Sequence, residues 1–263
     1  MIRFSIVTIT FNASHTLPRT LRSVAEQKWA ALEHIIIDGA STDGTLQLAE
    51  AYKQEQEAGE TGSMRTVSLL SEPDRGLYDA MNKGLARATG DYVLFLNAGD
   101  CFPSPDTLSS IAARPECQSD DRSQWPAVLY GQTDVVDDEG RFVSHRHLTA
   151  PRHLTWRSFM RGMLVCHQAF YARTDLARTL PYDLQYRFSA DVDWCIRVMK
   201  EAHRRHLPLL YLDAVVALYL QEGQTTRNHR ASLKERFRVM VHHYGWLPTL
   251  AMHAWFVVRA WLK

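Results

Sequence analysis

Polar side chains follow each of the four apolar segments in the first hundred residues. In chain order they are Thr10 and Asn12, Asp38, Glu72 and Asp74, and Asn97 and Asp100. The carboxyl ends of parallel strands meet at one edge of a sheet, and ligands of open α/β proteins bind there. Asp38 by itself is equally well explained as the cap of the following helix. Four such groups together indicate a binding site.

The chemistry of this cluster favours a hard cation and a phosphate. Carboxylate and amide oxygens without a His or Cys ligand set are typical of Mg²⁺ or Mn²⁺, which share their ligands with phosphate oxygens. A nucleotide with a diphosphate would supply them. The chain has no Walker A sequence and no G-x-G-x-x-G, which argues against P-loop NTPases and NAD enzymes. Arg75 and Lys83 could neutralise phosphate charge, although an amphipathic helix with exposed charges explains them as well.

Strands must alternate with helices to bring these residues to one edge. Apolar, β-branched runs predict strands at 4–11, 34–38, 66–70 and 92–96, with helices after 18, 46 and 78. This alternation predicts a mainly parallel sheet, half of a doubly wound nucleotide-binding fold. Beyond residue 100 we expect helices at 103–113, 154–160 and 191–203, strands at 127–130, 168–171 and 209–216, and a hairpin at 135–145. The sequence of residues 229–262 predicts two helices, with a break between them near Gly245 and Pro248.

Composition excludes several other classes of protein. With 263 residues, 46% hydrophobic and 22% charged, the chain is neither disordered, collagen-like nor a coiled coil. Its net charge of +1 gives no reason to expect nucleic acid as a partner. The 4 cysteines form no C-x-x-C pair, which disfavours a zinc site and disulfides and indicates a reducing compartment. The first residues read as a strand rather than a signal peptide, so we expect a cytoplasmic protein.

The C-terminal segment differs in charge from the rest. Residues 227–263 hold seven Lys or Arg and one Glu, a net charge of +6, among many Trp, Leu and Val residues. Such a pattern fits a pair of helices at a membrane surface. Helices that cover the sheet, or that form a dimer interface, would have the same pattern.

Several motifs, in one order, resemble family 2 glycosyltransferases of the GT-A fold. They are TITFN, IIIDGASTDGT, SEPDRGLYDAMNKGLARATGDY, FLNAGD, CHQAFY (166–171), YRFSADVDW (186–194) and GQTT (223–226). The branch that builds bacterial exopolysaccharides such as colanic acid looks most similar. The resemblance implies a GT-A domain at 1–226, with a nucleotide-binding half (1–100) and an acceptor half (101–226), before the basic, amphipathic C-terminal helices (227–263).

The resemblance also implies an activity. It is inverting transfer of a sugar from a UDP- or GDP-linked donor, with Mg²⁺ or Mn²⁺. The acceptor would be a saccharide or a polyprenyl-diphosphate-linked saccharide at the inner face of the cytoplasmic membrane, where residues 227–263 could make peripheral contact.

The family's roles carry over to particular residues. The nucleoside and donor would be contacted by Thr8, Thr10, Phe11, Asn12, Asp38, Glu72, Asp74, Asn82, Lys83 and Asn97. Asp100 would bind the metal, and Asp191 would be the catalytic base. His167 and Gln168 would lie near donor and acceptor. Asp193 is a competitor for the base, but on a helix it points about 200° away from Asp191, so we expect it to pair with Arg187 or Arg197.

Two departures from the family pattern weaken parts of this assignment. Many relatives read Asp-Asp-Gly-Ser where this chain has Asp38-Gly39-Ala40-Ser41, which affects one nucleobase contact. The metal motif keeps only Asp100, with Asn97 and Gly99 at its other positions. Metal binding would then depend largely on the donor's phosphates.

Two other functions fit parts of the sequence. A sugar-nucleotide nucleotidyltransferase also combines an α/β sheet, a nucleotide and Mg²⁺, but it needs a Gly-rich basic loop after the first strand. The segment TFNASHTLPRT lacks that loop. The degenerate metal motif would also suit a protein that binds a donor or a partner without turnover, against which the presence of Asp100 and Asp191 argues.

Overall fold

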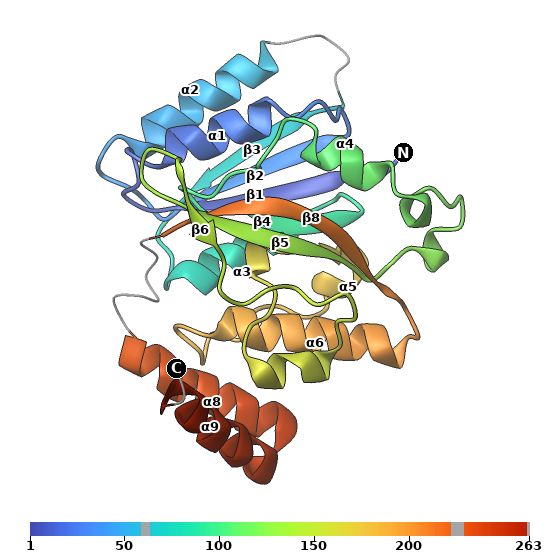
Figure 1. Cartoon of the computed structure of the whole chain (residues 1–263). Helices are drawn as coiled ribbons and strands as arrows, with labels where there is room; N and C mark the ends of the chain where they lie inside the picture. The colour runs from blue at the N-terminus through green and yellow to red at the C-terminus, as the bar shows by residue number, and fades with distance from the viewer. Residues whose placement is uncertain (59–63, 222–228, 262–263) are drawn as a thin grey trace.

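The computed structural model describes residues 1–58, 64–221 and 229–261 (Figure 1). The GQTT motif at 223–226 and the predicted boundary at 226 lie outside the described residues. Helices cover both faces of one 8-stranded sheet, in the order β3-β2-β1-β4-β7-β5-β6, with β8 paired to β5. This confirms the predicted α/β fold.

The first half of the sheet is parallel, as its apolar runs predict. It comprises β1 (Phe4–Thr10), β2 (Leu32–Asp38), β3 (Thr66–Ser71) and β4 (Tyr92–Phe95). Every residue of β1 and β2 is buried, because helices cover both faces. Helices α1 (Leu17–Ala25), α2 (Thr45–Glu57) and α4 (Thr107–Ala112) lie on one face in Figure 1, and α3 (Leu77–Arg87) lies on the other.

The second half of the sheet is mixed. Strand β7 (Phe170–Arg173) runs antiparallel to β4, and β5 (Val128–Val136) runs antiparallel to both β7 and β6 (Phe142–His145). Strand β8 (Leu209–Leu220) is parallel to β5. Because pairing continues from β4 to β7, both halves of the chain share a sheet. Their predicted division into donor and acceptor halves stays a prediction about function.

Two predicted elements of this half differ from the structure. The predicted strand at 168–171 begins instead with a 3₁₀ turn, His167–Ala169, and β7 starts only at Phe170. The turn places His167 and Gln168 beside the end of β4 rather than within a strand. The predicted helix at 154–160 is a 3₁₀ helix, Trp156–Arg161. Short 3₁₀ turns also occur at Pro115–Cys117 and Arg122–Gln124, and α5 (Thr174–Ala177) precedes α6 (Ala190–Arg204).

The C-terminal helices are α8 (His229–Tyr244) and α9 (Trp246–Trp261). They break at Gly245, whose φ of +85° suits glycine, whereas Pro248 lies in the first turn of α9 and breaks nothing. Helix α8 packs on α6, and the ring of Tyr244 stacks on Trp156 with centroids 5.6 Å apart. This contact supports the expectation that the helices cover the domain. Among the described residues, no helix has the length and apolar character needed to cross a membrane.

Candidate active site

The carboxyl ends of β1, β2 and β3 meet at one edge of the sheet. The strand register places Thr10 beside Asp38 and Asp38 beside Ser71. A Cβ atom added to Gly39 would lie 2.5 Å from Asp74 Oδ2 and 3.2 Å from Phe11 Cδ2. The residues that follow these three strands are therefore in contact, as the sequence predicts.

Asp38 is fully buried and holds this loop together. Its Oδ2 accepts hydrogen bonds from Ser41 N–H at 3.0 Å and Ser71 Oγ at 2.7 Å, and its Oδ1 accepts from Ser41 Oγ. Asn12 Oδ1 accepts from Thr42 N–H at 2.9 Å. These oxygens are occupied by protein groups. The hydroxyl of Thr10, in contrast, is buried without a partner and remains available to a ligand.

The unusual Gly39-Ala40 pair has a steric explanation. Ala40 adopts a φ of +61°, in the left-handed region that favours glycine. At position 39 a side chain would collide with Asp74. The aspartate that many relatives carry at position 39 therefore does not fit unless Asp74 moves.

Two residues expected to contact the donor are occupied inside the protein. Thr8 is buried, and its Oγ1 lies 2.9 Å from His34 Nε2. Asn82 donates from Nδ2 to Tyr182 O at 2.9 Å and accepts from Tyr182 N–H at 2.7 Å. The structure therefore gives both side chains structural partners instead of bringing them to the edge.

Lys83 and Glu72 do lie close together beside the edge. Lys83 Nζ lies 2.9 Å from Glu72 Oε1 and donates to Pro73 O at 2.8 Å. Glu72 thus positions the Lys83 cation next to the loop that carries Asp74. Asp74 itself accepts from Gly76 N–H at 2.8 Å.

Asn97, His167, Asp191 and Tyr78 form a connected polar group. Asn97 Nδ2 lies 3.3 Å from His167 Nε2 and can only donate, so Nε2 accepts and Nδ1 carries the proton. That nitrogen lies 3.5 Å from Asp191 Oδ2. Asp191 Oδ1 accepts from Tyr78 Oη at 3.0 Å and from Val192 N–H at 2.9 Å. The end of β4, the 167–169 turn and the starts of α3 and α6 thus meet at Asp191.

The environment of Asp191 keeps its carboxylate charged. Burial raises its pKa, but the interaction with His167 and the positive charge of Arg236 outweigh burial, so the net pKa is lowered. Burial raises the pKa of Tyr78 well above its usual value, so this phenol remains a hydrogen-bond donor. Oδ2 keeps an acceptor position, since 3.5 Å is too long for a strong hydrogen bond to His167.

Asp100 is buried beside this group, with 4% of its surface exposed. Its Oδ2 accepts from Gln168 Nε2 at 2.9 Å, and its Oδ1 accepts from Leu220 N–H at 3.2 Å. Burial raises the pKa of Asp100, although the hydrogen bond from Gln168 opposes the shift. Gln168 therefore positions Asp100.

The residues at this turn fit a divalent cation that takes most of its ligands from substrate and water. Asn97 Oδ1 is buried without a partner, and Asp100 N–H closes the turn onto Asn97 O at 2.9 Å. One carboxylate and one amide oxygen are hard donors. Among the described residues no three His, Cys, Asp or Glu side chains gather into a metal site.

Asp193 faces away from Asp191, as the helical spacing predicts. Its Oδ2 pairs with Arg197 Nε at 2.6 Å, and its Oδ1 lies 2.8 Å from His243 Nε2 on α8. Burial raises the pKa of Asp193, but the hydrogen bond with His243 and the positive charge of Arg197 outweigh burial, so the net pKa is lowered. Asp193 therefore joins α6 to α8, and its pairing with Arg197 is the one expected from the sequence.

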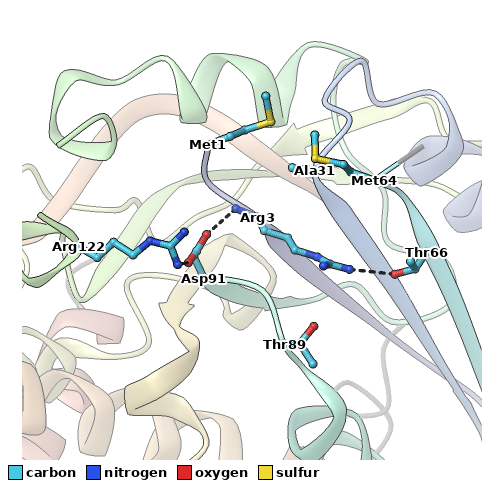
Figure 2. A pocket seen from close by; sticks show the side chains of 8 residues that line it. All are labelled: Met1, Arg3, Ala31, Met64, Thr66, Thr89, Asp91 and Arg122. Carbon is cyan, nitrogen blue, oxygen red and sulfur yellow. Dashed lines mark hydrogen bonds and ion pairs between the residues drawn. The ribbon is translucent and has the colours of Figure 1, made fainter. Parts of the chain in front are cut away.

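A pocket of about 340 Å³ lies at the opposite, amino-terminal edge of the strands (Figure 2). Its polar groups pair with one another: Asp91 accepts from Arg3 N–H at 2.7 Å and pairs with Arg122, and Arg3 reaches Thr66 Oγ1 at 3.2 Å. Arg3 Nε is buried without a partner, but none of these groups belongs to the polar edge. The pocket is lined by Met1, Arg3, Ala31, Met64, Thr66, Thr89, Asp91 and Arg122.

A sheet whose parallel half gathers carboxylates, amides and a half-buried His–Asp pair at its carboxyl edge is typical of an α/β enzyme of the nucleotide-binding type. Comparison with known families makes this specific: residues 5–173 match the family model for glycosyl transferase family 2. The chain belongs to that family and is a glycosyltransferase.

Curated relatives and solved structures agree with this placement. A PGL/p-HBAD biosynthesis glycosyltransferase of Mycobacterium bovis is 35% identical over 84% of this chain and 77% of its own length. The amylovoran biosynthesis glycosyltransferase AmsB of Erwinia amylovora is 30% identical over 76% of this chain and 64% of its own.

The solved structures share the GT-A fold. S. aureus TarS in complex with UDP-GlcNAc is similar over 92% of this chain and 68% of its own, with a TM-score of 0.67 at 19% identity. The mannosyltransferase PcManGT from Pyrobaculum calidifontis, in complex with GDP-Man and Mn²⁺, is similar over 96% of this chain and 68% of its own, with a TM-score of 0.63 at 18% identity.

The sequence interpretation missed Tyr78. Its spacing with Met81 and Leu85 indicates a core stripe, and its ring is indeed buried against Tyr182 with centroids 5.6 Å apart. The hydroxyl at the tip nevertheless reaches Asp191, 113 residues away. A buried tyrosine hydroxyl usually needs a hydrogen-bond partner. This requirement is the one feature of the sequence that indicates a polar contact for Tyr78.

Proposed function

We propose that the protein transfers a sugar, with inversion at the anomeric carbon, from a UDP- or GDP-linked donor to a saccharide or lipid-linked saccharide in bacterial surface polysaccharide biosynthesis. The observation that carries the proposal is the connection of Asn97, His167 and Tyr78 to the Asp191 carboxylate at the carboxyl edge. The donors named with TarS and PcManGT, UDP-GlcNAc and GDP-Man, are of the same chemical class.

In this mechanism Asp191 accepts the proton of the acceptor hydroxyl as that oxygen attacks the anomeric carbon. The bond from that carbon to the diphosphate breaks, and the nucleoside diphosphate leaves. Tyr78 and Val192 N–H fix one carboxylate oxygen, and the other faces His167, so the base is oriented before substrate arrives. The lowered pKa keeps it unprotonated at neutral pH.

The donor would lie across the ends of β1 to β4. Thr10, Phe11, Asn12 and Asp38 border the nucleoside, and Asp74 and Lys83 border the sugar diphosphate. Asp100 and Asn97 would hold Mg²⁺ or Mn²⁺, which neutralises charge on the leaving diphosphate when bound. Residues 1–100 thus serve the donor and 101–226 the acceptor.

The C-terminal helices would place the enzyme at the inner face of the cytoplasmic membrane. Exposed apolar side chains on α9 include Leu247 at 82% and Trp255 at 54%, and α8 next to it is basic in sequence, with Lys234 exposed. An apolar face beside basic residues is the pattern of an interfacial helix. It suits an acceptor held on a polyprenyl diphosphate.

Release of nucleoside diphosphate by the purified protein tests the proposal. A panel of UDP- and GDP-sugars would be tried with Mn²⁺, Mg²⁺ or EDTA and detergent-dispersed lipid-linked acceptors. We expect release from one donor, a fall of about 10²- to 10⁴-fold in Asp191→Asn, and unchanged donor affinity, since the lost group acts in proton transfer. Asp213→Asn, on exposed β8 backbone with a φ of +51°, is the matched control and should retain full activity.

Asp100→Asn tests the metal, because it keeps the shape of the buried residue but removes its charge. We expect it to need more Mn²⁺ for half-maximal activity. Release of pyrophosphate from a nucleoside triphosphate would identify a nucleotidyltransferase instead. Donor binding by calorimetry without turnover on any acceptor would identify a binding protein of the same fold.

A further inference from the structure

Arg236 lies on the face of α8 that packs against the rest of the domain. Ser232, Val239, Met240 and His243 are buried along the same side of the helix, and Arg236 follows Ser232 by four residues. In Figure 1, α8 runs beneath α6, whose first turn carries Asp191. The side chain of Arg236 therefore belongs to the interior side of the helix, not to its solvent side.

This stretch of α8 is fixed just before the catalytic aspartate. Glu235 accepts hydrogen bonds from the N–H groups of Arg187 at 2.9 Å and Phe188 at 2.6 Å. Ser189 Oγ donates to Ser232 O at 3.3 Å. The three residues that precede Ala190 and Asp191 are thus held by the turn of α8 that carries Arg236.

The charge of Arg236 has no counter-charge of its own. In the part of the chain that the structure describes, its guanidinium forms no hydrogen bond and no ion pair within 4 Å, and its Nε is buried without a partner. Its positive charge acts on Asp191. Neighbouring Glu235 is occupied by the backbone of 187 and 188. Arg236 is half-buried, and its buried Nε–H without a partner favours an anionic ligand, because an unpartnered buried donor is costly.

We propose that Arg236 binds a phosphate oxygen of the acceptor beside Asp191. A guanidinium presents several donors to a phosphoryl group and can hold it through two parallel hydrogen bonds. This inference rests on the proposed function and deepens it, since it names the chemical feature by which the acceptor is recognised. The acceptor would carry a phosphate or diphosphate close to the hydroxyl that reacts.

The position of Arg236 favours the acceptor over the donor. The residues that border the donor follow β1 to β4, whereas Arg236 comes from α8, which packs mainly on α9 and α6. The base must contact the acceptor hydroxyl, so a positive charge that acts on Asp191 from α8 is on the acceptor side. The exposed apolar face of α9 continues from the same helix pair. A phosphate attached to a lipid would fit this arrangement.

Binding of farnesyl diphosphate, used as a short soluble probe, tests the inference without requiring turnover. Calorimetry would compare the full-length protein with Arg236→Gln, Arg236→Lys and Arg238→Gln. We expect Arg236→Gln to bind the probe about 10- to 100-fold more weakly, as for loss of a charge-assisted hydrogen bond. Arg236→Lys should keep part of the affinity. Arg238, two residues further on and exposed, is the matched control and should change little.

A second measurement separates acceptor from donor. With an active donor, Arg236→Gln should raise the KM for a diphosphate-linked acceptor and leave the KM for the donor and for an uncharged glycoside acceptor unchanged. Equal probe binding by all four proteins would overturn the inference, as would a selective loss of nucleoside diphosphate affinity, which would place Arg236 on the donor. Absence of turnover in the unsubstituted protein would count against the proposed function, while the calorimetry would still decide the role of Arg236.

Discussion

Single residues at the sheet edge show how much of the site a motif can predict. Asp191, Asp100 and His167 were identified from the family motif, and the structure brings them near one another. The same motif also suggested Thr8 and Asn82, whose polar groups are bonded to His34 and to the backbone of Tyr182. A sequence records that a polar residue is present. It does not record which partner, dozens of residues away, has already taken its hydrogen bonds.

Gly39 offers a test of the edge at the scale of one methyl group. In Gly39→Ala the new Cβ would overlap Asp74 Oδ2, the end of a flexible side chain, and would press on the Phe11 ring. The fold should tolerate the change within about 1 kcal/mol, because only side chains need to move. Affinity for the nucleoside diphosphate should fall about tenfold. Thermal unfolding and calorimetry measure the two effects, and an unchanged affinity would remove Asp74 and Phe11 from the donor site.

At the scale of elements, apolar periodicity predicted the four parallel strands to within about two residues at each end. It failed at the 167–169 turn, because that turn is held by distant partners. Gln168 bonds to Asp100, 68 residues away, and His167 bonds to Asn97, 70 residues away. Local propensity carries no information about such contacts. The residues that sequence patterns place least well are therefore the ones that join the two halves of the site.

Strands β1 and β2 and helix α2 meet at a buried histidine with a measurable effect on stability. His34 is fully buried between Thr8 Oγ1 and Tyr52 Oη, and burial lowers its pKa to about 3. The unfolded chain binds a proton at His34 below pH 6.5, whereas the folded protein does not until about pH 3. Stability is therefore lost as the pH falls through this window. The loss is about 1.4 kcal/mol per pH unit, or about 2 kcal/mol between pH 6.5 and 5.

His34→Gln separates this contribution from the carboxylates that also titrate in acid. The amide can still bond to Thr8 and Tyr52 but does not titrate. Urea unfolding of both proteins at a series of pH values should show a difference in unfolding free energy that changes with pH below 6.5 and is constant above it. Parallel curves would mean that His34 is not kept neutral by the fold.

At the scale of the whole molecule, the two C-terminal helices differ in how they pack against the rest of the protein. Helix α8 is joined to the domain through His243 and Tyr244, whereas one side of α9 has no partner among the described residues. Leu247, Leu250 and Trp255 on that side are at least half exposed, and Val258 is 48% exposed. The last three lie 3, 8 and 11 residues after Leu247, which places all four on a continuous apolar face. The expectations that the tail covers the domain and that it reaches a membrane are therefore compatible, because they concern different helices.

Negative charge introduced on this apolar face tests the membrane contact. Vesicles of phosphatidylethanolamine with phosphatidylglycerol should sediment the unsubstituted protein more strongly than vesicles of phosphatidylcholine, because anionic lipid attracts the basic α8. The double variant Leu247→Glu, Leu250→Glu should bind at least tenfold more weakly, since burying each leucine contributes about 1.5–3 kcal/mol. Turnover of a water-soluble acceptor should not change.

Phe142→Glu is the matched control, because Phe142 is 58% exposed but lies on β6, away from the C-terminal helices. It should leave vesicle binding unaffected. A double variant that binds vesicles normally, but that sediments as a smaller species than the unsubstituted protein in solution, would assign the α9 face to a second copy of the chain. The polyprenyl acceptor would then have to reach Asp191 without help from α9, and Arg236 would be the remaining contact expected for its phosphate.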